Sequence, residues 1–260
     1  MKIDFALPVY NEEACLSVNV SKLISYLQSK ALCDWQVIIV DNASTDETPI
    51  IADVLAAEIY EVHAVHLEQK GRGYALKSAF QSSQADAIIY MDIDLSTELG
   101  AIPKLVRSIE SGAYDLSIGS RLKKGSVVIG RSHIREFISR SYNLLIRGMF
   151  FNGFHDAQCG FKGVRLETIR QLLPLIQNKN WFFDTELLVL AEYASLKVRT
   201  VPVKWIEDPD TRVNIPKTVY EDIKSVKITY KVKTKPFFKK LFPVNNSYEI
   251  ILNDKSIELD

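Results

Sequence analysis

The chain of 260 residues has three cysteines and no Cys-x-x-Cys pair, which argues against a disulfide framework or a zinc site and favours reduced thiols in a cytosolic protein. Its 32 basic and 32 acidic residues cancel, so no overall charge favours nucleic acid and any basic partner site has to be local. No apolar run reaches the roughly 18 to 20 residues that span a bilayer, because Arg147 interrupts the best stretch, 144–151. Residues 1–8 lack the layout of a signal peptide. The four histidines show no ligand spacing and are read as structural or surface residues.

What the chain does contain is a 47% hydrophobic content and apolar runs that alternate with helical patterns. The expected strands are 3–8, 36–40, 62–67, 87–91 and 116–118, with short ones near 160–164 and 198–203. The alternation predicts an α/β fold, a mostly parallel sheet with helices on both faces. The first helix is expected to open near Asn11, and a long one is expected at about 132–149. We expect one domain over 1–222 and a basic tail over 223–260.

The apolar run that ends at Asp92-Ile93-Asp94 is the most informative feature. A buried strand that stops at two carboxylates delivers them to the carboxyl edge of the sheet, where open α/β folds place their ligands. Hard oxygen donors suit a divalent cation that keeps other positions for phosphate oxygens. The alternative is a strand end with solvated acids. Asp-x-Asp by itself does not decide between them.

Two further segments are expected at the same edge. Asp41 ends the run 37–40, and Ser44 or Thr45 could cap the next helix. The turn Lys70-Gly71-Arg72-Gly73 opens a helix and offers small residues and two cations to the phosphates or ribose of a nucleotide. A capped turn and an ordinary strand-to-helix turn are the competing interpretations.

Positions 131, 135, 139 and 143 recur every four residues, so the long helix presents two arginines, a serine and an asparagine on one face. This face is either a solvated surface or, together with Arg121 and Arg212, a pocket for a dianionic phosphate that guanidinium groups grip with paired hydrogen bonds. Farther along, Trp181, Phe182 and Phe183 are read as core rather than as a slot for lipid.

Five motifs, in order, resemble the signature of GT-A fold, family 2 glycosyltransferases: Pro8-Val9-Tyr10-Asn11-Glu12, Val40-Asp41-Asn42-Ala43-Ser44-Thr45-Asp46, Lys70-Gly71-Arg72-Gly73, Asp92-Ile93-Asp94-Leu95-Ser96 and Gly119-Ser120-Arg121. Three more resemble the polyprenyl-phosphate branch, closest to dolichyl-phosphate glucosyltransferases: residues 156–162, 181–188 and 201–205. The resemblance covers roughly residues 1–230. It implies a Rossmann-like GT-A sheet and an enzyme that uses a nucleotide sugar.

The resemblance also implies roles for individual residues. Asp92 and Asp94 would hold Mg²⁺ or Mn²⁺ on the diphosphate of the sugar nucleotide. The donor nucleotide would be bound by Pro8, Tyr10, Glu12, Asp41, Asn42, Lys70, Gly71 and Asp92. The acceptor phosphate would be bound by Arg121, Arg131, Arg135, Ser139 and, from a mobile loop, Arg212. Many relatives carry a second acid where this chain has Asn42, so that contact would fall to an amide, without charge assistance.

The expected reaction is inverting transfer of a hexose, glucose from UDP-glucose, to a polyprenyl or dolichyl phosphate at the cytoplasmic face of a membrane. A phosphate monoester is already a charged nucleophile at neutral pH and needs little help from a general base. The residues expected to act in catalysis are Asp94, Arg121, Arg135, Asp156 and Glu186; the last two orient arginines, bind sugar hydroxyls or merely support the arginine cluster.

Three alternatives stay open at this point. The acceptor could be a sugar hydroxyl of a polysaccharide or glycolipid, in which case one acid would act as the base. The donor could be GDP-mannose, as in polyprenyl-phosphate mannosyltransferases. The protein could bind a sugar nucleotide without transferring it. No nucleic-acid partner is expected.

The end of the chain adds one expectation. Residues 224–240 contain seven lysines and no acid, with aromatic residues beside them. Such a segment either rests on an anionic membrane surface, each lysine contributing about 1 kcal/mol, or is a solvated tail.

Overall fold

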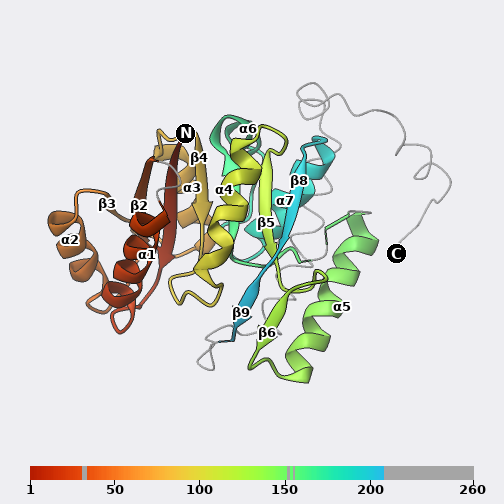
Figure 1. Ribbon diagram of the computed structural model, residues 1–260, viewed down its shortest axis with the longest axis horizontal. Coiled ribbons are helices and arrows are strands. Elements are labelled where there is room, and N and C mark those ends of the chain that lie inside the picture. The colour runs from red at the N-terminus through yellow and green to blue at the C-terminus, as the bar shows by residue number, and fades with distance from the viewer. Residues whose placement is uncertain (31–33, 151–152, 155, 208–260) are drawn as a thin grey trace.

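The computed structural model describes residues 1–30, 34–150, 153–154 and 156–207. They form a seven-stranded sheet in the order β3-β2-β1-β4-β7-β5-β8 (Figure 1). The strands are β1 (Lys2–Val9), β2 (Asp34–Asp41), β3 (Val62–His66), β4 (Ala87–Tyr90), β5 (Leu116–Ser120), β7 (Lys162–Arg165) and β8 (Val198–Pro202). All neighbours are parallel except β7, which runs antiparallel to both β4 and β5. Arg212 and the basic tail lie outside the described residues.

Helices cover both faces of the sheet, as the alternating pattern predicts. They are α1 (Leu16–Lys30), α2 (Thr48–Glu58), α3 (Arg72–Ser82), α4 (Ile102–Glu110) after the short η1 (Leu99–Ala101), α5 (His133–Phe150), α6 (Leu166–Leu172) and α7 (Phe183–Tyr193). One core contains residues of α1, α2 and α4, and the other contains residues of α3, α5, α6 and α7. In Figure 1, α1 and α4 lie in front of the sheet.

Strand β1 shows why two cores form. Its side chains alternate, so Ile3, Phe5 and Leu7 enter one core while Ala6 enters the other. Strands that are buried on both faces are mostly apolar, which is the pattern of β1, β2 and β4 apart from buried Asp4 in β1. Within the described part of the chain, none of the helices combines the length and the apolar character needed to cross a bilayer.

The first helix begins at Leu16, not near Asn11 as expected. Asn11 has a left-handed backbone (φ 54°), and its side-chain oxygen accepts a hydrogen bond from the Thr45 amide at 2.8 Å. Its own amide donates to Ser44 Oγ at 2.9 Å. These bonds hold the segment after β1 against the loop after β2, so helical geometry starts only after the turn that Glu12 closes with Cys15.

A small parallel pair of strands, β6 (Val127–Ile129) and β9 (Lys204–Ile206), was not expected from the sequence, because each strand has three residues. This pair joins distant parts of the chain. The Ile206 amide donates to the Ser96 carbonyl at 2.8 Å, and Thr97 forms a bridge with Trp205. Strand β9 therefore lies directly beside the segment that follows Asp94.

Candidate active site

Asp92 follows β4 at the carboxyl edge of the sheet, where the sequence predicts it. Its Oδ1 accepts a hydrogen bond from Arg72 Nη2 at 2.9 Å. The carboxylate also lies against the backbone of Gly160, since a Cβ at that position would be 1.9 Å from Asp92 Oδ2. The side chain of Asp92 retains 32% exposure, so it stays accessible from this edge.

Asp94 is exposed and forms a local turn with Ser96, which donates its amide to Oδ1 at 2.9 Å and its hydroxyl to Oδ2 at 2.7 Å. These hydrogen bonds fix the direction of the carboxylate. No cluster of three or more His, Cys, Asp or Glu suited to a metal ion occurs among the described residues. Two hard carboxylates without a third protein ligand fit a cation that takes its other ligands from a diphosphate and water.

A buried charge cluster holds Arg72, the partner of Asp92. Asp184, at the start of α7, accepts hydrogen bonds from Arg72, from Lys162 and, at 2.7 Å, from the hydroxyl of Tyr90. Lys162 is fully buried and Tyr90 likewise. Burial alone would raise the pKa of Asp184, but the two cations hold it below its usual range. The pKa of Arg72 is raised, because Asp184 and Asp92 outweigh the opposing effect of burial.

Trp181 corrects one expectation from the sequence. Phe182 and Phe183 are buried in the core as predicted, but Trp181 is 42% exposed. The guanidinium of Arg72 lies 5.2 Å from the centre of its ring. Trp181 therefore covers the cation that holds Asp92 instead of filling the core, because Arg72 offers its face a favourable cation–π partner.

The residues expected to bind the nucleoside gather at the ends of β1 and β2. Pro8 and Asp41 are neighbouring strand positions, with Pro8 paired to Val40 and Val9 to Asp41. Tyr10 follows β1, and the ammonium of Lys70 lies 3.2 Å from the centre of its ring. The Glu12 amide donates to Thr48 Oγ1 at 2.8 Å, which fixes the loop after β1 to α2.

Asn42 has a structural contact next to its predicted role in nucleotide binding, and the expected helix cap differs from the prediction. The side-chain oxygen of Asn42 accepts the Gly71 amide at 2.6 Å, so it holds the glycine turn that opens α3. The N-cap of α2 is Glu47, without a side-chain hydrogen bond, rather than Ser44 or Thr45. Ser44 is instead engaged with Asn11, which explains why it does not cap.

His66 was not singled out by the sequence, yet it contacts Asp41. Its Nδ1 lies 3.3 Å from Asp41 Oδ2 and its Nε2 lies 2.9 Å from Asp53 Oδ1. Burial lowers the pKa of His66, but hydrogen bonds with Asp53 and Asp41 outweigh this effect and raise it above 6.5. His66 thus orients the carboxylate predicted to meet the nucleoside.

At the same edge of the sheet, on the other side of β7 from Asp92, Arg121 follows β5 and forms a buried ion pair with Asp156. Its Nε and Nη2 donate to the two oxygens of Asp156 at 2.9 and 2.7 Å, and its amide donates at 2.8 Å. The ring of Trp205 lies beneath this guanidinium at 4.9 Å. Burial would raise the pKa of Asp156, but Arg121 lowers it. Asp156 is therefore a charged support for Arg121.

Arg131 and Arg135 converge on Glu207, the residue after β9. Arg135 Nη1 donates to Glu207 Oε1 at 2.7 Å, whereas Arg131 Nε lies 3.8 Å from Oε2, too far for a hydrogen bond. The side chain of Arg131 is 8% exposed, and burial followed by the nearby charge of Arg121 lowers its pKa. Its Nε and Nη1, and Nε1 of Trp205, have no hydrogen-bond partner among the described residues.

The other residues of the predicted arginine face, at positions 135, 139 and 143, lie on α5. This helix begins at His133, so Arg131 lies just before it rather than on its first turn. Asn143 is buried and accepts the Ala157 amide at 3.0 Å, and it donates to the Ser139 carbonyl at 2.9 Å. The face with 135, 139 and 143 is thus turned toward the loop before β7, not toward solvent alone.

Glu186, on α7, holds the loop that precedes this helix. Its carboxylate accepts the amides of Gln177 and Asn178, at 3.1 and 2.8 Å. The same loop approaches the glycine turn, because the Lys179 carbonyl accepts the Tyr74 amide at 3.0 Å. Glu186 therefore holds the loop that packs against α3, and its expected catalytic role stays a prediction.

The two groups of residues meet at one edge of the sheet. Strand β7 lies between β4, which leads to Asp92, and β5, which leads to Arg121. At a strand spacing of 4.7–4.9 Å, the ends of β4 and β5 are about 10 Å apart. Asp156 and Gly160, in the loop before β7, contact Arg121 and Asp92 respectively. Carboxylates and guanidiniums thus flank one short loop.

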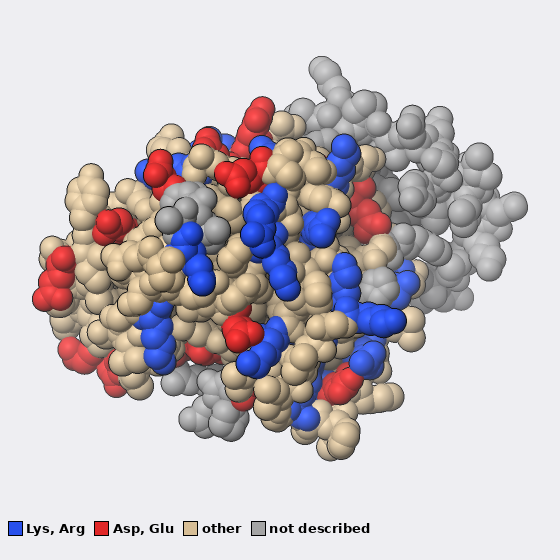
Figure 2. All heavy atoms as spheres, viewed as in Figure 1, with Lys and Arg blue, Asp and Glu red and all other residues tan. Residues whose placement is uncertain are grey.

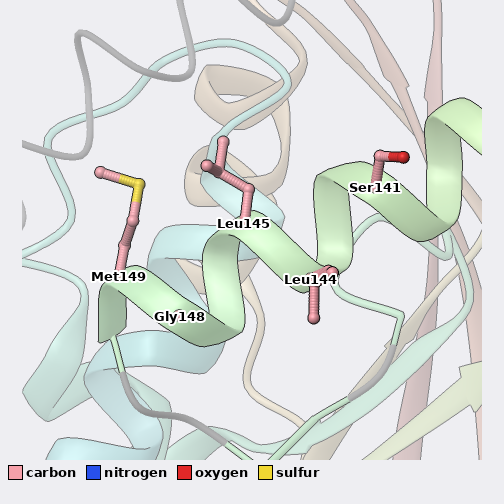
Figure 3. A pocket seen from close by; sticks show the side chains of 5 residues that line it. All are labelled: Ser141, Leu144, Leu145, Gly148 and Met149. Carbon is pink, nitrogen blue, oxygen red and sulfur yellow. The ribbon is translucent and has the colours of Figure 1, made fainter.

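Two surface features lie outside this edge. Between α4 and β8 a groove of about 540 Å³ is lined by four cations, Lys104, Arg107, Lys123 and Arg199, and Figure 2 shows basic side chains gathered over these elements. The outer side of α5 carries exposed Leu144, Leu145 and Met149 around a shallow hollow of about 380 Å³, with Leu145 and Met149 on the same side of the helix (Figure 3).

Several residues of the site escaped the sequence reasoning: Arg72 as a partner of Asp92, and Lys162, Asp184, Trp205, Glu207 and His66. The available signal was Lys162, which follows the apolar Phe161 and opens a strand in the middle of the sheet, since a buried cation requires a buried acid. The identity of that acid could not be read from the sequence, because Asp184 is 22 residues away.

Comparisons with known proteins identify the family of this chain and its fold. The family model for glycosyl transferase family 2 matches residues 4–173. Glycosyltransferase AglD of Haloferax volcanii is 37% identical over 220 residues, which are 83% of this chain and 35% of that protein. The dolichyl-phosphate beta-glucosyltransferases of Saccharomyces cerevisiae and Homo sapiens are 26% and 27% identical over 79% of this chain, and over 67% and 68% of their own lengths. The chain therefore spans about a third of AglD and about two thirds of the others.

Among solved structures, glucosyl-3-phosphoglycerate synthase from Mycobacterium tuberculosis, in complex with Mn²⁺ and UDP-glucose, superposes with a TM-score of 0.63. The alignment covers 95% of this chain and 80% of that one at 18% identity, which establishes a shared fold. The fold is the GT-A fold of glycosyltransferases. The chain belongs to glycosyl transferase family 2.

Proposed function

We propose that this protein transfers glucose from UDP-glucose to a polyprenyl phosphate, with inversion at the anomeric carbon and with Mg²⁺ or Mn²⁺ on the donor. The observation that carries the proposal is the buried Arg131, whose Nε and Nη1 have no hydrogen-bond partner among the described residues. Buried donors without partners are costly, and a phosphate would satisfy them. Arg131 lies in the same cluster as Arg121, which flanks the loop that also contacts Asp92.

The acceptor decides which chemistry the chain has to supply. A phosphate monoester carries close to two negative charges at neutral pH, so its oxygen can attack without prior loss of a proton. Arg121, Arg131 and Arg135 would hold and orient it, with Ser139 as a further donor. Positioning of this kind lowers the barrier because it removes the entropy cost of bringing two reactants together. A cation held by Asp92 and Asp94 would stabilise the departing nucleotide diphosphate.

The donor would occupy the other side of the loop before β7. Pro8, Tyr10, Glu12 and Asp41 surround the nucleoside in this proposal, with Asp41 oriented by His66. Lys70 and the Gly71 turn lie next to the diphosphate, and Asn42 maintains that turn through the Gly71 amide. In place of the second acid that many relatives carry, this chain has Asn42, whose side-chain amide holds the turn.

Transfer to a sugar hydroxyl needs a general base on the acceptor side, and the contacts of the two candidate acids weigh against it. Asp156 is fully buried and shared between three donors of Arg121. Glu186 holds a loop on the donor side. For the donor, relatives named as dolichyl-phosphate beta-glucosyltransferases favour glucose over the mannose of GDP-mannose.

We further propose that the enzyme works at the cytoplasmic surface of a membrane, because its acceptor would be a lipid. The exposed apolar residues of α5 support this placement, since Leu144, nine residues after Arg135, lies on the side of the helix opposite that arginine. A helix with apolar residues outward and cations nearby suits the boundary between headgroups and acyl chains.

The test is a transfer assay in detergent micelles with labelled UDP-glucose or GDP-mannose, Mn²⁺, and undecaprenyl or dolichyl phosphate or a free disaccharide. We expect organic-phase label from UDP-glucose and a phosphate lipid. Arg131→Ala and Asp94→Asn should each lower the rate by about a hundredfold or more, in line with lost positioning or charge stabilisation. The control Arg140→Ala removes an exposed arginine of α5 that pairs with Glu136, and its rate should stay within about twofold of the wild type.

Each other outcome points elsewhere. Label on the disaccharide alone would replace the lipid phosphate with a hydroxyl acceptor. Mn²⁺-dependent binding of UDP-glucose without any product would favour a binding protein. Full activity of Arg131→Ala would remove the arginine cluster from the acceptor site.

A further inference from the structure

Glu207 occupies the centre of the arginine cluster without satisfying it. Its side chain is 13% exposed and its Oε1 accepts one hydrogen bond, from Arg135. Its Oε2 is buried and has no hydrogen-bond partner among the described residues, although Arg131 Nε lies 3.8 Å away. The carboxylate is thus close enough to offset the charge of Arg131 but poorly placed to bond with it.

The backbone places Glu207 firmly at this position. Its amide donates to the Ile129 carbonyl at 2.9 Å, which continues the pairing of β6 with β9. Gly130 follows with a left-handed backbone (φ 79°), and a Cβ there would be 3.8 Å from the Cβ of Glu207. The chain therefore turns tightly from β6 into Arg131, opposite Glu207, and the carboxylate of Glu207 is held by one hydrogen bond, from Arg135.

The charges of the cluster favour a ligand that has more oxygen atoms and more negative charge than the carboxylate of Glu207. Three guanidiniums, of Arg121, Arg131 and Arg135, face the carboxylates of Asp156 and Glu207, which leaves one net positive charge. Without Glu207 the cluster would carry two, which equals the charge of a phosphate dianion. The terminal oxygens of a phosphate could also accept from Arg131 and from Trp205, whose indole nitrogen lacks a partner among the described residues.

We infer that Glu207 is a displaceable counter-ion that holds the arginines in the free protein and gives up its place when the acceptor phosphate binds. It acts as a specificity-determining residue: a monoanion would have to compete with an internal carboxylate of equal charge, whereas a dianion outcompetes it. The inference rests on the proposed function, because it concerns the same acceptor site. It predicts that removing this carboxylate tightens phosphate binding, while a merely structural ion pair would weaken it.

The test is calorimetric titration of the full chain with inorganic phosphate at neutral pH. Glu207→Gln should bind phosphate about tenfold more tightly than the wild type, since a close charge pair is worth more than the 1.4 kcal/mol that a tenfold change represents. Glu98→Gln is the matched control: it removes an exposed carboxylate that pairs with Lys204 of β9, and its affinity should be unchanged. In the transfer assay, Glu207→Gln should lower KM for the phosphate lipid.

Thermal unfolding supplies a second readout that separates competition from loss of structure. Without phosphate, Glu207→Gln should melt below the wild type, because the arginines lose their counter-ion; with saturating phosphate its gain in Tm should exceed that of the wild type. If Glu207→Gln does not fold, Glu207→Asp replaces it, since the shorter side chain keeps the charge but withdraws from Arg135 and should tighten binding by a smaller factor.

Two results would overturn the inference: one leaves the proposed function intact, and the other rejects the acceptor site as well. Equal or weaker phosphate binding by Glu207→Gln, with binding still abolished by Arg131→Ala, rejects the counter-ion role and leaves the proposed function intact. Phosphate binding that survives Arg131→Ala unchanged rejects both the inference and the acceptor site.

Discussion

Glycine at position 160 illustrates how much of the site depends on single residues. Its missing side chain leaves the space that the carboxylate of Asp92 occupies, because a Cβ would come within 1.9 Å of Oδ2 and 2.8 Å of Oδ1. Arg72 holds the same carboxylate from the other side. The direction of Asp92 is therefore fixed by one glycine and one arginine, neither of which would itself touch the cation.

We expect Gly160→Ala to lower the transfer rate by about a hundredfold, because a shift of about 1 Å in a positioned group costs that much. The measurement is the transfer assay, with thermal unfolding to confirm that the variant folds. Gly148→Ala is the control: no heavy atom lies within 4 Å of its added Cβ, and alanine should stabilise α5 by roughly 0.5–1 kcal/mol. An active Gly160→Ala enzyme would show that Asp92 need not be held in this direction.

At the scale of elements, α7 and β7 are joined through charge as well as through apolar packing. Asp184 in the first turn of α7 meets Lys162, the first residue of β7, and Arg72, the first residue of α3. Three elements that cover or form the middle of the sheet thus meet at one carboxylate. Such a buried cluster adds little net stability when complete, but it is costly to break, because the remaining charges stay buried.

We therefore expect Asp184→Asn to lower the free energy of unfolding by about 3–5 kcal/mol, measured by urea denaturation at neutral pH. Asp53→Asn, the same change at a side chain that is 68% exposed, should cost no more than about 1 kcal/mol. Because the folded pKa of Asp184 lies below 3.8, its contribution is complete above the unfolded pKa and is lost as the pH falls through the lower, folded value. A variant as stable as the wild type would contradict this account of the cluster.

For the whole molecule, the arrangement of charge matters more than its sum. The net formal charge is zero, yet basic side chains gather over α4 and β8 on the face in Figure 2, and the arginine cluster stands beside the acids at the edge of the sheet. The two halves of the site come from strands on either side of β7, so binding of the donor should stabilise a large part of the sheet together.

Binding of UDP with Mn²⁺ tests this view at the level of the molecule. At a ligand concentration of 100 Kd the stabilisation is about 2.7 kcal/mol, which corresponds to a rise in Tm of roughly 5–10 °C for a domain of 150–250 residues. We expect one cooperative transition that moves as a whole, measured by differential scanning calorimetry. The shift should shrink without Mn²⁺ and in Asp94→Asn. An equal shift without the cation would argue against a metal held by Asp92 and Asp94.

Patterns along the chain set the layers of this protein and the edge of the sheet that carries the acids. Apolar runs depend only on neighbours in the chain, so the strands of the seven-stranded sheet, the helices on both of its faces and the acids at the ends of β2 and β4 could be predicted, whereas the three-residue strands β6 and β9 could not. The start of α1 and the cap of α2 could not, because Asn11 and Ser44 bond to each other across 33 residues.

Which charges become partners depends on how the elements pack in space. Arg72 pairs with Asp184 across 112 residues, and Arg135 with Glu207 across 72. A buried charge requires an opposite one, but Coulomb attraction depends on distance in space and is indifferent to spacing in the chain. The sequence could therefore indicate that buried charges have partners, whereas the packing of β7 and β9 brings the particular partners together.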